Sequence, residues 1–209
     1  MKVIPATGAA ALSVAEYVIA SAMLLLRGAY QSTPAVAAGQ WPRNALSNGR
    51  ETAGKTLGLI GFGSIGQLSA RLAQALGMSV IAYDAMMDAD HPAFATSGVR
   101  AAGLDEVIAT SDVVSLHVPL VDSTRDLFNA ARIASMKKGA VLINTARGGI
   151  VDEGALAAAL RSGHLGGAAI DVFGKEPLPA SEHFKDCPNL LLTPHIAGVS
   201  AESNERVSF

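Results

Sequence analysis

The sequence predicts a doubly wound α/β fold, an open parallel sheet covered by helices on both faces. Three observations support this prediction: short apolar runs that alternate with helical segments, a glycine-rich turn after the first run, and polar residues directly after later runs. Half of the 209 residues are hydrophobic and 16% are charged, which indicates an ordered chain with a large core. The net charge of −2 gives no electrostatic reason to expect nucleic acid or a membrane as partner.

The first 54 residues are the least regular part of the sequence. Val3-Ile4-Pro5 is typical of an initial strand, and the apolar stretch Val14–Leu26 predicts a buried helix. Ser13 is the expected N-cap, with Glu16 completing a capping box. The stretch is too short to span a bilayer. A helix that is apolar nearly all round needs cover on more than one side, so we expect a second domain or subunit to lie over it. A polar surface excursion follows over residues 31–53.

From residue 55 onward, apolar runs typical of buried parallel strands alternate with helical segments. The predicted strands are Thr56–Ile60, Ser79–Tyr83, Val113–Leu116, Ala140–Ile143, Gly167–Ile170 and Asn189–Leu192. The predicted helices are Ile65–Leu76, Leu104–Thr110, Asn129–Met136 and Glu153–Ser162. We therefore expect βαβ units over residues 55–198, followed at 199–209 by the first turns of a further helix. Residues 1–209 are expected to form one nucleotide-binding domain of a longer polypeptide.

A G-x-G-x-x-G motif formed by Gly61, Gly63 and Gly66 lies between a predicted strand and a predicted helix. In that context Gly61 permits a tight turn and Gly63 lets the backbone approach a pyrophosphate, while Gly66 lets the helix pack closely on the strand. The amides of Ser64 and Ile65 then point at the phosphates, aided by the helix dipole. The motif predicts a dinucleotide site.

Asp84 ends the second predicted strand, 21 residues after Gly63. At this spacing a carboxylate accepts hydrogen bonds from the ribose diol of the adenosine. The next residues, Ala85, Met86 and Met87, include no arginine to hold a 2′-phosphate, so NAD is expected rather than NADP. The alternative roles for Asp84 are a helix N-cap and a solvated turn residue.

Arg147, Glu176 and His195 each lie just past an apolar run. The carboxyl ends of parallel strands share one edge of the sheet, so these three side chains can converge although they are far apart in sequence. A His–carboxylate pair provides an acid or base near neutral pH, and an arginine provides a cation for a carboxylate and a developing oxyanion. Together they predict reduction of a 2-oxo acid. Taken singly, each has the alternative role of a solvated loop residue or a structural histidine.

Six short motifs are spread along nearly the whole chain. They are Ser13–Tyr17, the Gly61–Gly66 turn, His117–Leu120, Asn144–Gly149, Asp171–Pro177 and Thr193–Gly198. In combination they resemble the NAD-dependent D-isomer-specific 2-hydroxyacid dehydrogenases, which include phosphoglycerate dehydrogenases and glyoxylate/hydroxypyruvate reductases. The resemblance implies a Rossmann-like NAD-binding domain, with the family's substrate domain absent from this chain.

The resemblance also implies roles for individual residues. Arg147 matches the residue that binds the substrate's carboxylate and carbonyl, His195 the proton donor or acceptor, and Glu176 its partner. Asp171 matches the residue that holds the nicotinamide carboxamide. The positions expected to contact NAD are Gly61, Gly63, Ser64, Ile65, Gly66, Asp84, Val118, Pro119, Thr145, Ala146, Arg147, Asp171, His195 and Gly198.

The expected function is hydride transfer between NAD(H) and a small 2-hydroxy or 2-oxo acid. The alternative is an NAD(H)-sensing interaction module of the corepressor type. A formate dehydrogenase is disfavoured, because those enzymes carry glutamine where Glu176 stands. The stretch Ala6–Gly28 is similar to dehydrogenases of sulfolactate and related hydroxy acids. A homodimer is expected, because the helix Ser13–Arg27 and the excursion after it match the region through which relatives pair.

The remaining cysteine and histidine residues point to no further chemistry. The single cysteine, Cys187, excludes an internal disulfide and fits a reducing compartment, so a cytoplasmic location is expected. No set of residues has the spacing of a metal site, and no metal is predicted. His117 is expected to have a local structural role, and His91, His164 and His183 are expected at the surface.

Overall fold

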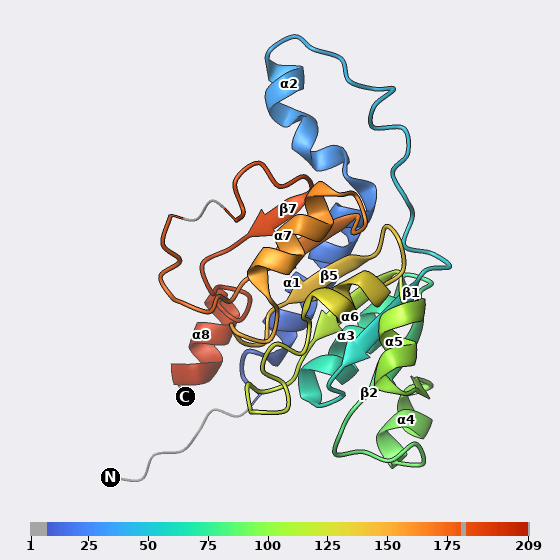
Figure 1. The fold of residues 1–209 in the computed structure, drawn as a ribbon. Helices are drawn as coiled ribbons and strands as arrows, with labels where there is room; N and C mark the ends of the chain where they lie inside the picture. Colours follow the sequence, from blue (N-terminus) through green and yellow to red (C-terminus); the bar gives the residue numbers. More distant parts are fainter. Residues whose placement is uncertain (1–7, 181–182, 209) are drawn as a thin grey trace.

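A seven-stranded sheet forms the centre of the computed structural model, which describes residues 8–180 and 183–208 (Figure 1). Its strands are β1 (Thr56–Ile60), β2 (Ser79–Tyr83), β3 (Arg100–Ala101), β4 (Val113–Leu116), β5 (Val141–Asn144), β6 (Gly167–Ile170) and β7 (Leu190–Leu192). All neighbouring strands are parallel, in the order β3-β2-β1-β4-β5-β6-β7. The strand order reverses between β1 and β4: β2 and β3 lie on one side of β1, and β4 to β7 lie on the other. Open α/β folds bind ligands at such a switch point.

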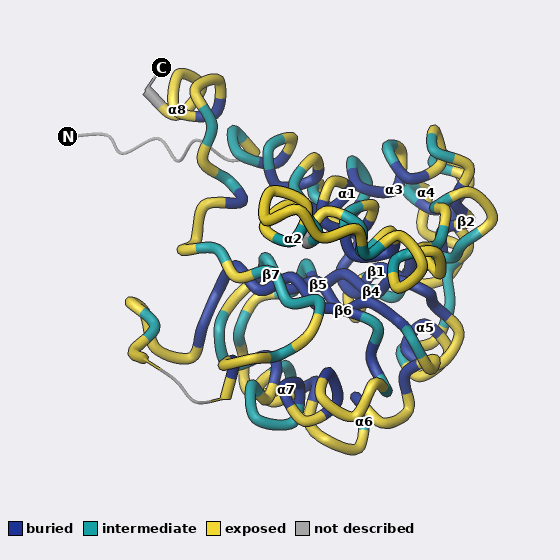
Figure 2. The backbone as a smooth tube through the Cα atoms, turned by 90° about the horizontal axis from the view of Figure 1, so that it is seen from above, coloured by how far each residue is buried: buried dark blue, intermediate teal, exposed yellow. Residues whose placement is uncertain are grey.

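Helices cover both faces of this sheet. They are α1 (Ala11–Arg27), the 3-10 helix η1 (Ala29–Ser32), α2 (Thr33–Ala37), α3 (Ser64–Ala75), α4 (Pro92–Ser97), α5 (Leu104–Thr110), α6 (Ala130–Ser135), α7 (Glu153–Arg161) and α8 (Ala201–Ser208). Figure 2 shows α1, α3 and α4 on one face and α5, α6 and α7 on the other. In Figure 1, α2 and the excursion around it extend away from the sheet. None of the helices in the described ranges is long and apolar enough to cross a membrane.

Two apolar clusters, one on each face, hold the layers together. Leu59 and Ile143 are fully buried in the cluster beneath α1 and α3. Their strand neighbours Ile60 and Leu142 are fully buried in the cluster beneath α5, α6 and α7. Consecutive strand residues therefore enter opposite cores, as the alternation of side chains along a strand requires. This confirms the prediction of a doubly wound parallel sheet covered on both faces. The predicted initial strand at residues 3–5 lies outside the described residues.

The predicted start of α1 is wrong. The helix begins at Ala11, because the carbonyl of Ala10 already accepts the first bond of the helical ladder. Ser13 lies within the first turn, and its hydroxyl contacts that of Ser200 at 3.0 Å instead of capping the helix. Glu16 is exposed and completes no capping box.

The α1 helix is buried on one side only. Its Val18 and Ala22 pack against α3 and the sheet. The opposite side is exposed, with Leu12 at 39% and Met23 at 41% accessibility. This chain by itself therefore covers one side of the helix. Cover by a second domain or subunit stays a prediction.

The sequence analysis did not predict the short elements α4 and β3. The α4 helix has six residues with Pro92 at its start, and the ring Nδ1 of His91 accepts a hydrogen bond from the amide of Ala93 at 3.2 Å. Strand β3 has only two residues and pairs with β2. Elements of this length carry too few residues to show a hydrophobic period.

A charged cluster closes the amino edge of the sheet, opposite the predicted site. Asp112 is 6% exposed and accepts hydrogen bonds from the amide of Thr56 at 2.9 Å and from Lys137 at 2.7 Å. Burial by itself would raise the pKa of Asp112. The hydrogen bonds from Lys137 and Thr56, with the charges of Lys137 and Lys55, outweigh burial and lower that pKa.

Asp112→Asn is expected to lower the free energy of unfolding at pH 7 by about 2 kcal/mol, because the amide loses the charge-assisted bond to Lys137. The folded-state pKa of Asp112 lies below the unfolded value, so its contribution is fully present above about pH 4 and is lost as the pH falls through the lowered folded-state value. Urea unfolding at pH 7 and in acid measures the difference. The exposed Asp122→Asn is the control, and a pH-independent effect of Asp112→Asn would contradict the argument.

Candidate active site

The glycine-rich turn lies at the carboxyl end of β1. Gly61 has a φ of 97°, and a Cβ built on it would lie 2.5 Å from the carbonyl oxygen of His117. A Cβ on Gly66 would lie 2.5 Å from the carbonyl oxygen of Gly61. A Cβ on Gly63 would meet no atom of the described residues within 4 Å. The turn is therefore tight on its inner side and open on its outer side.

The amino terminus of α3 is shaped to receive an anion. Its N-cap is Gly63, and among the described residues no side chain caps the helix. No acidic residue lies in the first turn. Ser64 is exposed and Ile65 half-buried, so the amides of this turn lie at the open side. A pyrophosphate fits this cradle, because backbone N–H groups and the helix dipole both favour negative charge.

Asp84 stands beside the same turn, at the end of β2. Its carboxylate accepts hydrogen bonds from the amides of Phe62 at 2.7 Å and Met86 at 2.8 Å. It also borders a hollow of about 530 Å³ that reaches toward Gly103. The alternative role as a helix N-cap is wrong, because the next helix, α4, has His91 at that position.

The segment after β4 forms the other wall of this region. His117 bonds to the hydroxyl of Ser115 at 3.0 Å, and burial lowers the pKa of His117 to about 4. The imidazole is therefore neutral at pH 7. These contacts agree with a local structural role for His117. Val118 is half-buried and Pro119 exposed at the same edge of the sheet.

Arg147 follows β5 on a short loop that Asn144 holds. The side chain of Asn144 is 1% exposed, donates to the carbonyl of Arg147 at 3.0 Å and accepts from the amide of Ala146 at 3.1 Å. The guanidinium of Arg147 donates to the carbonyl of Ala146 at 2.6 Å. The buried hydroxyl oxygen of Thr145 has no hydrogen-bond partner among the described residues. The sequence prediction missed Asn144, although a polar residue that ends an apolar strand was a usable signal.

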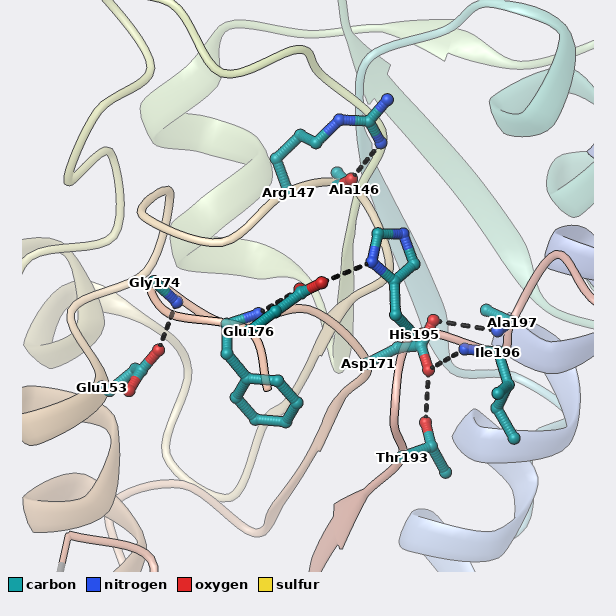
Figure 3. A network of polar contacts seen from close by, with 11 residues as sticks. Ala146, Arg147, Glu153, Asp171, Gly174, Glu176, Thr193, His195, Ile196 and Ala197 are labelled. Atoms are coloured by element: carbon teal, nitrogen blue, oxygen red, sulfur yellow. Dashed lines mark hydrogen bonds and ion pairs between the residues drawn. The ribbon is translucent and has the colours of Figure 1, made fainter. Parts of the chain in front are cut away.

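Glu176 and His195 form a direct pair. The carboxylate of Glu176 lies 2.7 Å from Nδ1 of His195, and its other oxygen accepts from the amide of Phe173 at 2.9 Å. Figure 3 shows the imidazole of His195 between Glu176 and Arg147. The hydrogen bond from His195 lowers the pKa of Glu176, as do the Phe173 amide and the positive charge of Arg147, so the carboxylate is ionised at pH 7.

The loop that carries His195 is anchored on Asp171. His195 has a φ of 57°, and its amide donates to the carbonyl of Asp171 at 2.9 Å. The Asp171 carboxylate is 1% exposed and accepts from Thr193 at 2.6 Å and from the amides of Ile196 at 2.8 Å and Ala197 at 2.9 Å (Figure 3). Asp171 thus holds the loop that presents the imidazole, a contribution that the sequence prediction did not include.

Two further contacts hold the loop of Glu176, one with the loop of Arg147 and one with α7. A Cβ built on Gly148 would overlap the backbone carbonyl of Phe173, so the two loops touch through their backbones. Glu153, the first residue of α7, accepts a hydrogen bond from the amide of Gly174 at 2.9 Å (Figure 3). Neither contact has a signature in the sequence.

A pocket of about 620 Å³ borders the pair of Glu176 and His195. Its apolar walls are Phe173, Pro177, Leu178, Leu192 and Pro194. The structure thus brings Arg147, Glu176 and His195 to one edge of the sheet, together with the glycine-rich turn and Asp84. Gly198, three residues after His195, lies against the start of α1, where a Cβ on it would be 3.2 Å from the Cβ of Ala10 and 3.5 Å from the side chain of Val14.

Comparison with known proteins identifies the family. The profile of the D-isomer specific 2-hydroxyacid dehydrogenase NAD binding domain matches residues 19–197. The (S)-sulfolactate dehydrogenase of Chromohalobacter salexigens is 56% identical over 207 residues, which cover 99% of this chain and 66% of that protein. The D-3-phosphoglycerate dehydrogenase of Haemophilus influenzae is 45% identical over 94% of this chain and 48% of that protein.

Solved structures agree with this identification. The NAD-dependent formate dehydrogenase from Staphylococcus aureus in complex with NAD superposes with a TM-score of 0.86 at 33% identity, over 96% of this chain and 60% of that one. The chain thus spans between about half and two thirds of the length of these relatives. Its fold, its glycine-rich turn and its sequence make it a member of the D-isomer specific 2-hydroxyacid dehydrogenase family, of which it carries the NAD-binding domain.

Proposed function

We propose that this chain provides the NAD-binding and acid–base part of an oxidoreductase that interconverts a small 2-hydroxy acid and its 2-oxo acid. The observation that carries the proposal is the 2.7 Å pair of His195 and Glu176. It lies at the sheet edge that also presents Arg147 and the open glycine-rich turn. An acid–base group, a cation and a dinucleotide cradle are the three parts that this reaction requires.

His195 exchanges the proton in this mechanism. Glu176 engages Nδ1, so Nε2 is the ring nitrogen that serves the substrate. In reduction Nε2 donates its proton to the carbonyl oxygen, and in oxidation the neutral ring accepts the hydroxyl proton. The ionised Glu176 stabilises the imidazolium form, and Arg147 anchors the substrate's carboxylate. NAD(H) supplies the hydride chemistry when it is bound.

The cofactor is assigned to residues along the carboxyl edge of the sheet. The amides of Ser64 and Ile65 would receive the pyrophosphate and Asp84 the adenosine ribose, while Asp171 would hold the nicotinamide carboxamide. Ala85 and Met86 follow Asp84 and carry no charge, which supports NAD rather than NADP. The remaining proposed contacts are Gly61, Gly63, Gly66, Val118, Pro119, Thr145, Ala146, Arg147, His195 and Gly198.

Asp84→Ala is expected to weaken NADH binding by about tenfold, because a charge-assisted bond to the ribose is lost. NADPH affinity should fall less, since the same carboxylate repels a 2′-phosphate. Fluorescence titration of the 209-residue chain with both nucleotides measures the two constants. The exposed Asp90→Ala is the control, and equal losses for NADH and NADPH would contradict the role of Asp84 in cofactor choice.

The substrate proposed first is a sulfonated 2-hydroxy acid, supported by 56% identity to a protein named (S)-sulfolactate dehydrogenase. A panel of sulfopyruvate, phosphohydroxypyruvate and hydroxypyruvate with NADH tests this in the full-length protein. A kcat/KM for sulfopyruvate at least about tenfold above the others is the expected result, since one well-placed ionic contact is worth that much. Preference for a different acid would leave the dehydrogenase assignment standing and replace the substrate.

The remaining assignments concern the wider protein. Residues 55–198 are proposed as the dinucleotide-binding core, with 1–54 and 199–209 as flanking segments that lead to a substrate domain. The exposed side of α1 and the excursion after it are proposed as the surface of a homodimer, in a cytoplasmic enzyme. The relatives named above are dehydrogenases, which favours turnover over a role as a sensing module of the corepressor type.

A further inference from the structure

We infer that Tyr17, on α1, is a positioning residue for His195 and acts through Thr193 and Asp171. The inference rests on the proposed function only in giving His195 a catalytic role. The contacts themselves are properties of the folded chain. Tyr17 and Thr193 are 176 residues apart in the sequence, and their hydroxyls lie 2.6 Å from each other.

The hydroxyls of Tyr17 and Thr193 form a continuous path to the Asp171 carboxylate. Thr193 lies 2.6 Å from Oδ1 of Asp171. The same carboxylate accepts the amides of Ile196 and Ala197, the two residues directly after His195. Three consecutive hydrogen-bonding steps thus connect a helix on one face of the sheet with the loop that presents the imidazole (Figure 3 shows the last two).

The chemistry of the groups fixes the direction of these bonds. An ionised carboxylate only accepts hydrogen bonds, so Thr193 must donate its single hydroxyl proton to Asp171. The oxygen of Thr193 is then an acceptor toward α1, and the phenol of Tyr17 must donate to it. Burial raises the pKa of Tyr17 and the nearby negative charge of Asp171 adds to this effect, and together they outweigh the lowering by the hydrogen bonds with Thr193 and Ser21. The phenol therefore keeps its proton at neutral pH and remains a donor.

The path ends at the two residues that follow His195, and His195 itself has an unfavourable backbone conformation. His195 occupies the left-handed region, with a φ of 57°, which costs free energy for a residue with a side chain. Bonds from the two following amides to Asp171 offset that cost. The Tyr17 phenol adds a donor to the Thr193 hydroxyl, and each hydrogen bond in such a chain polarises the next. A helix residue outside the catalytic set thus helps to keep the imidazole in its observed orientation.

Amide hydrogen exchange in the 209-residue chain tests the proposal without needing turnover. In Tyr17→Phe, the amides of Ile196 and Ala197 are expected to exchange about fivefold faster, the change that follows from loss of one hydrogen bond. Amides of α7 should not change, which shows that the fold is intact. Tyr30→Phe is the matched control, because Tyr30 is 60% exposed and lies on η1.

Variants at Thr193 separate a path from independent contacts. Thr193→Ser keeps the hydroxyl, so the amides of Ile196 and Ala197 should stay protected from exchange. In Thr193→Val the hydroxyl is absent, and both amides should lose this protection. Adding Tyr17→Phe to Thr193→Val should cause no further loss, because the path is already broken. Unchanged exchange in Tyr17→Phe, or additive effects in the double variant, would overturn the proposal. These exchange results are independent of turnover. If the full-length protein shows no dehydrogenase activity while the exchange results hold, Tyr17 still positions the loop of residues 193–198, and only the catalytic role of His195 is removed.

Discussion

Replacement of His195 by glutamine is expected to lower kcat of the full-length protein by about 10³-fold, while NADH binds with nearly unchanged affinity. Glutamine can keep a hydrogen bond to Glu176, but it cannot donate and accept a proton at the position of Nε2. Most of the proposed NAD contacts, including the pyrophosphate cradle at the turn after β1, lie outside His195, so loss of the imidazole contact should change the affinity little. Stopped-flow reduction of a 2-oxo acid and NADH fluorescence titration measure the two properties separately.

The exposed His183→Gln serves as the control for this experiment. Its turnover should equal that of the unmodified protein, because His183 lies on the loop before β7 and not at the paired carboxylate. A His195→Gln enzyme that retained a near-normal rate would remove the acid–base assignment. Loss of NADH binding in His195→Gln would instead show that the imidazole supports the cofactor.

Gly148→Ala is expected to reduce both stability and activity. The added methyl group would overlap the backbone carbonyl of Phe173, and neither side of this contact is a flexible side chain that could move away. The loops of Arg147 and Glu176 must therefore separate, at a cost of about 3 kcal/mol in the free energy of unfolding. A displacement of about 1 Å between catalytic groups lowers kcat by about a hundredfold.

Gly103→Ala is a matched control for Gly148→Ala. Gly103 has an ordinary extended backbone, with φ −68° and ψ 153°, and a Cβ there would meet no described atom within 4 Å. Urea unfolding should show a loss of no more than about 1 kcal/mol for Gly103→Ala, because the only expected cost is the exchange of glycine for alanine at the N-cap of α5. If Gly148→Ala left stability and kcat unchanged as well, the close contact between the two loops would be irrelevant to the site.

The sequence predicts those parts of the fold that depend on a pattern within a few consecutive residues. Strand β4, Val113–Leu116, is recognisable because both of its faces are buried and every residue is apolar or small. The glycine-rich turn is recognisable because Gly61, Gly63 and Gly66 keep their spacing within six residues, between a strand and a helix. Arg147, Glu176 and His195 follow from their positions after strands, since parallel strands end at a common edge.

The parts that the sequence does not predict depend on contacts between distant segments. The start of α1 depends on a turn before Ala11 that competes with the Ser13 cap. The bond between Tyr17 and Thr193 joins the two ends of the chain, and the contact of Gly148 with Phe173 joins two loops. No local period or spacing encodes these contacts, although they determine the geometry of the site. The side chains proposed for catalysis are thus easier to recognise in the sequence than the residues that hold them.

The two outermost strands have a consequence for how this protein associates with itself. Strand β3 has two residues and β7 has three, and Pro188 and Pro194 flank β7 closely. A proline has no amide hydrogen to offer, and so short an edge gives a neighbouring strand few bonds. Copies of the protein are therefore poorly suited to joining their sheets edge to edge into aggregates through β3 or β7. The homodimer proposed above would therefore form through helix and loop surfaces, where side chains rather than backbone groups determine specificity.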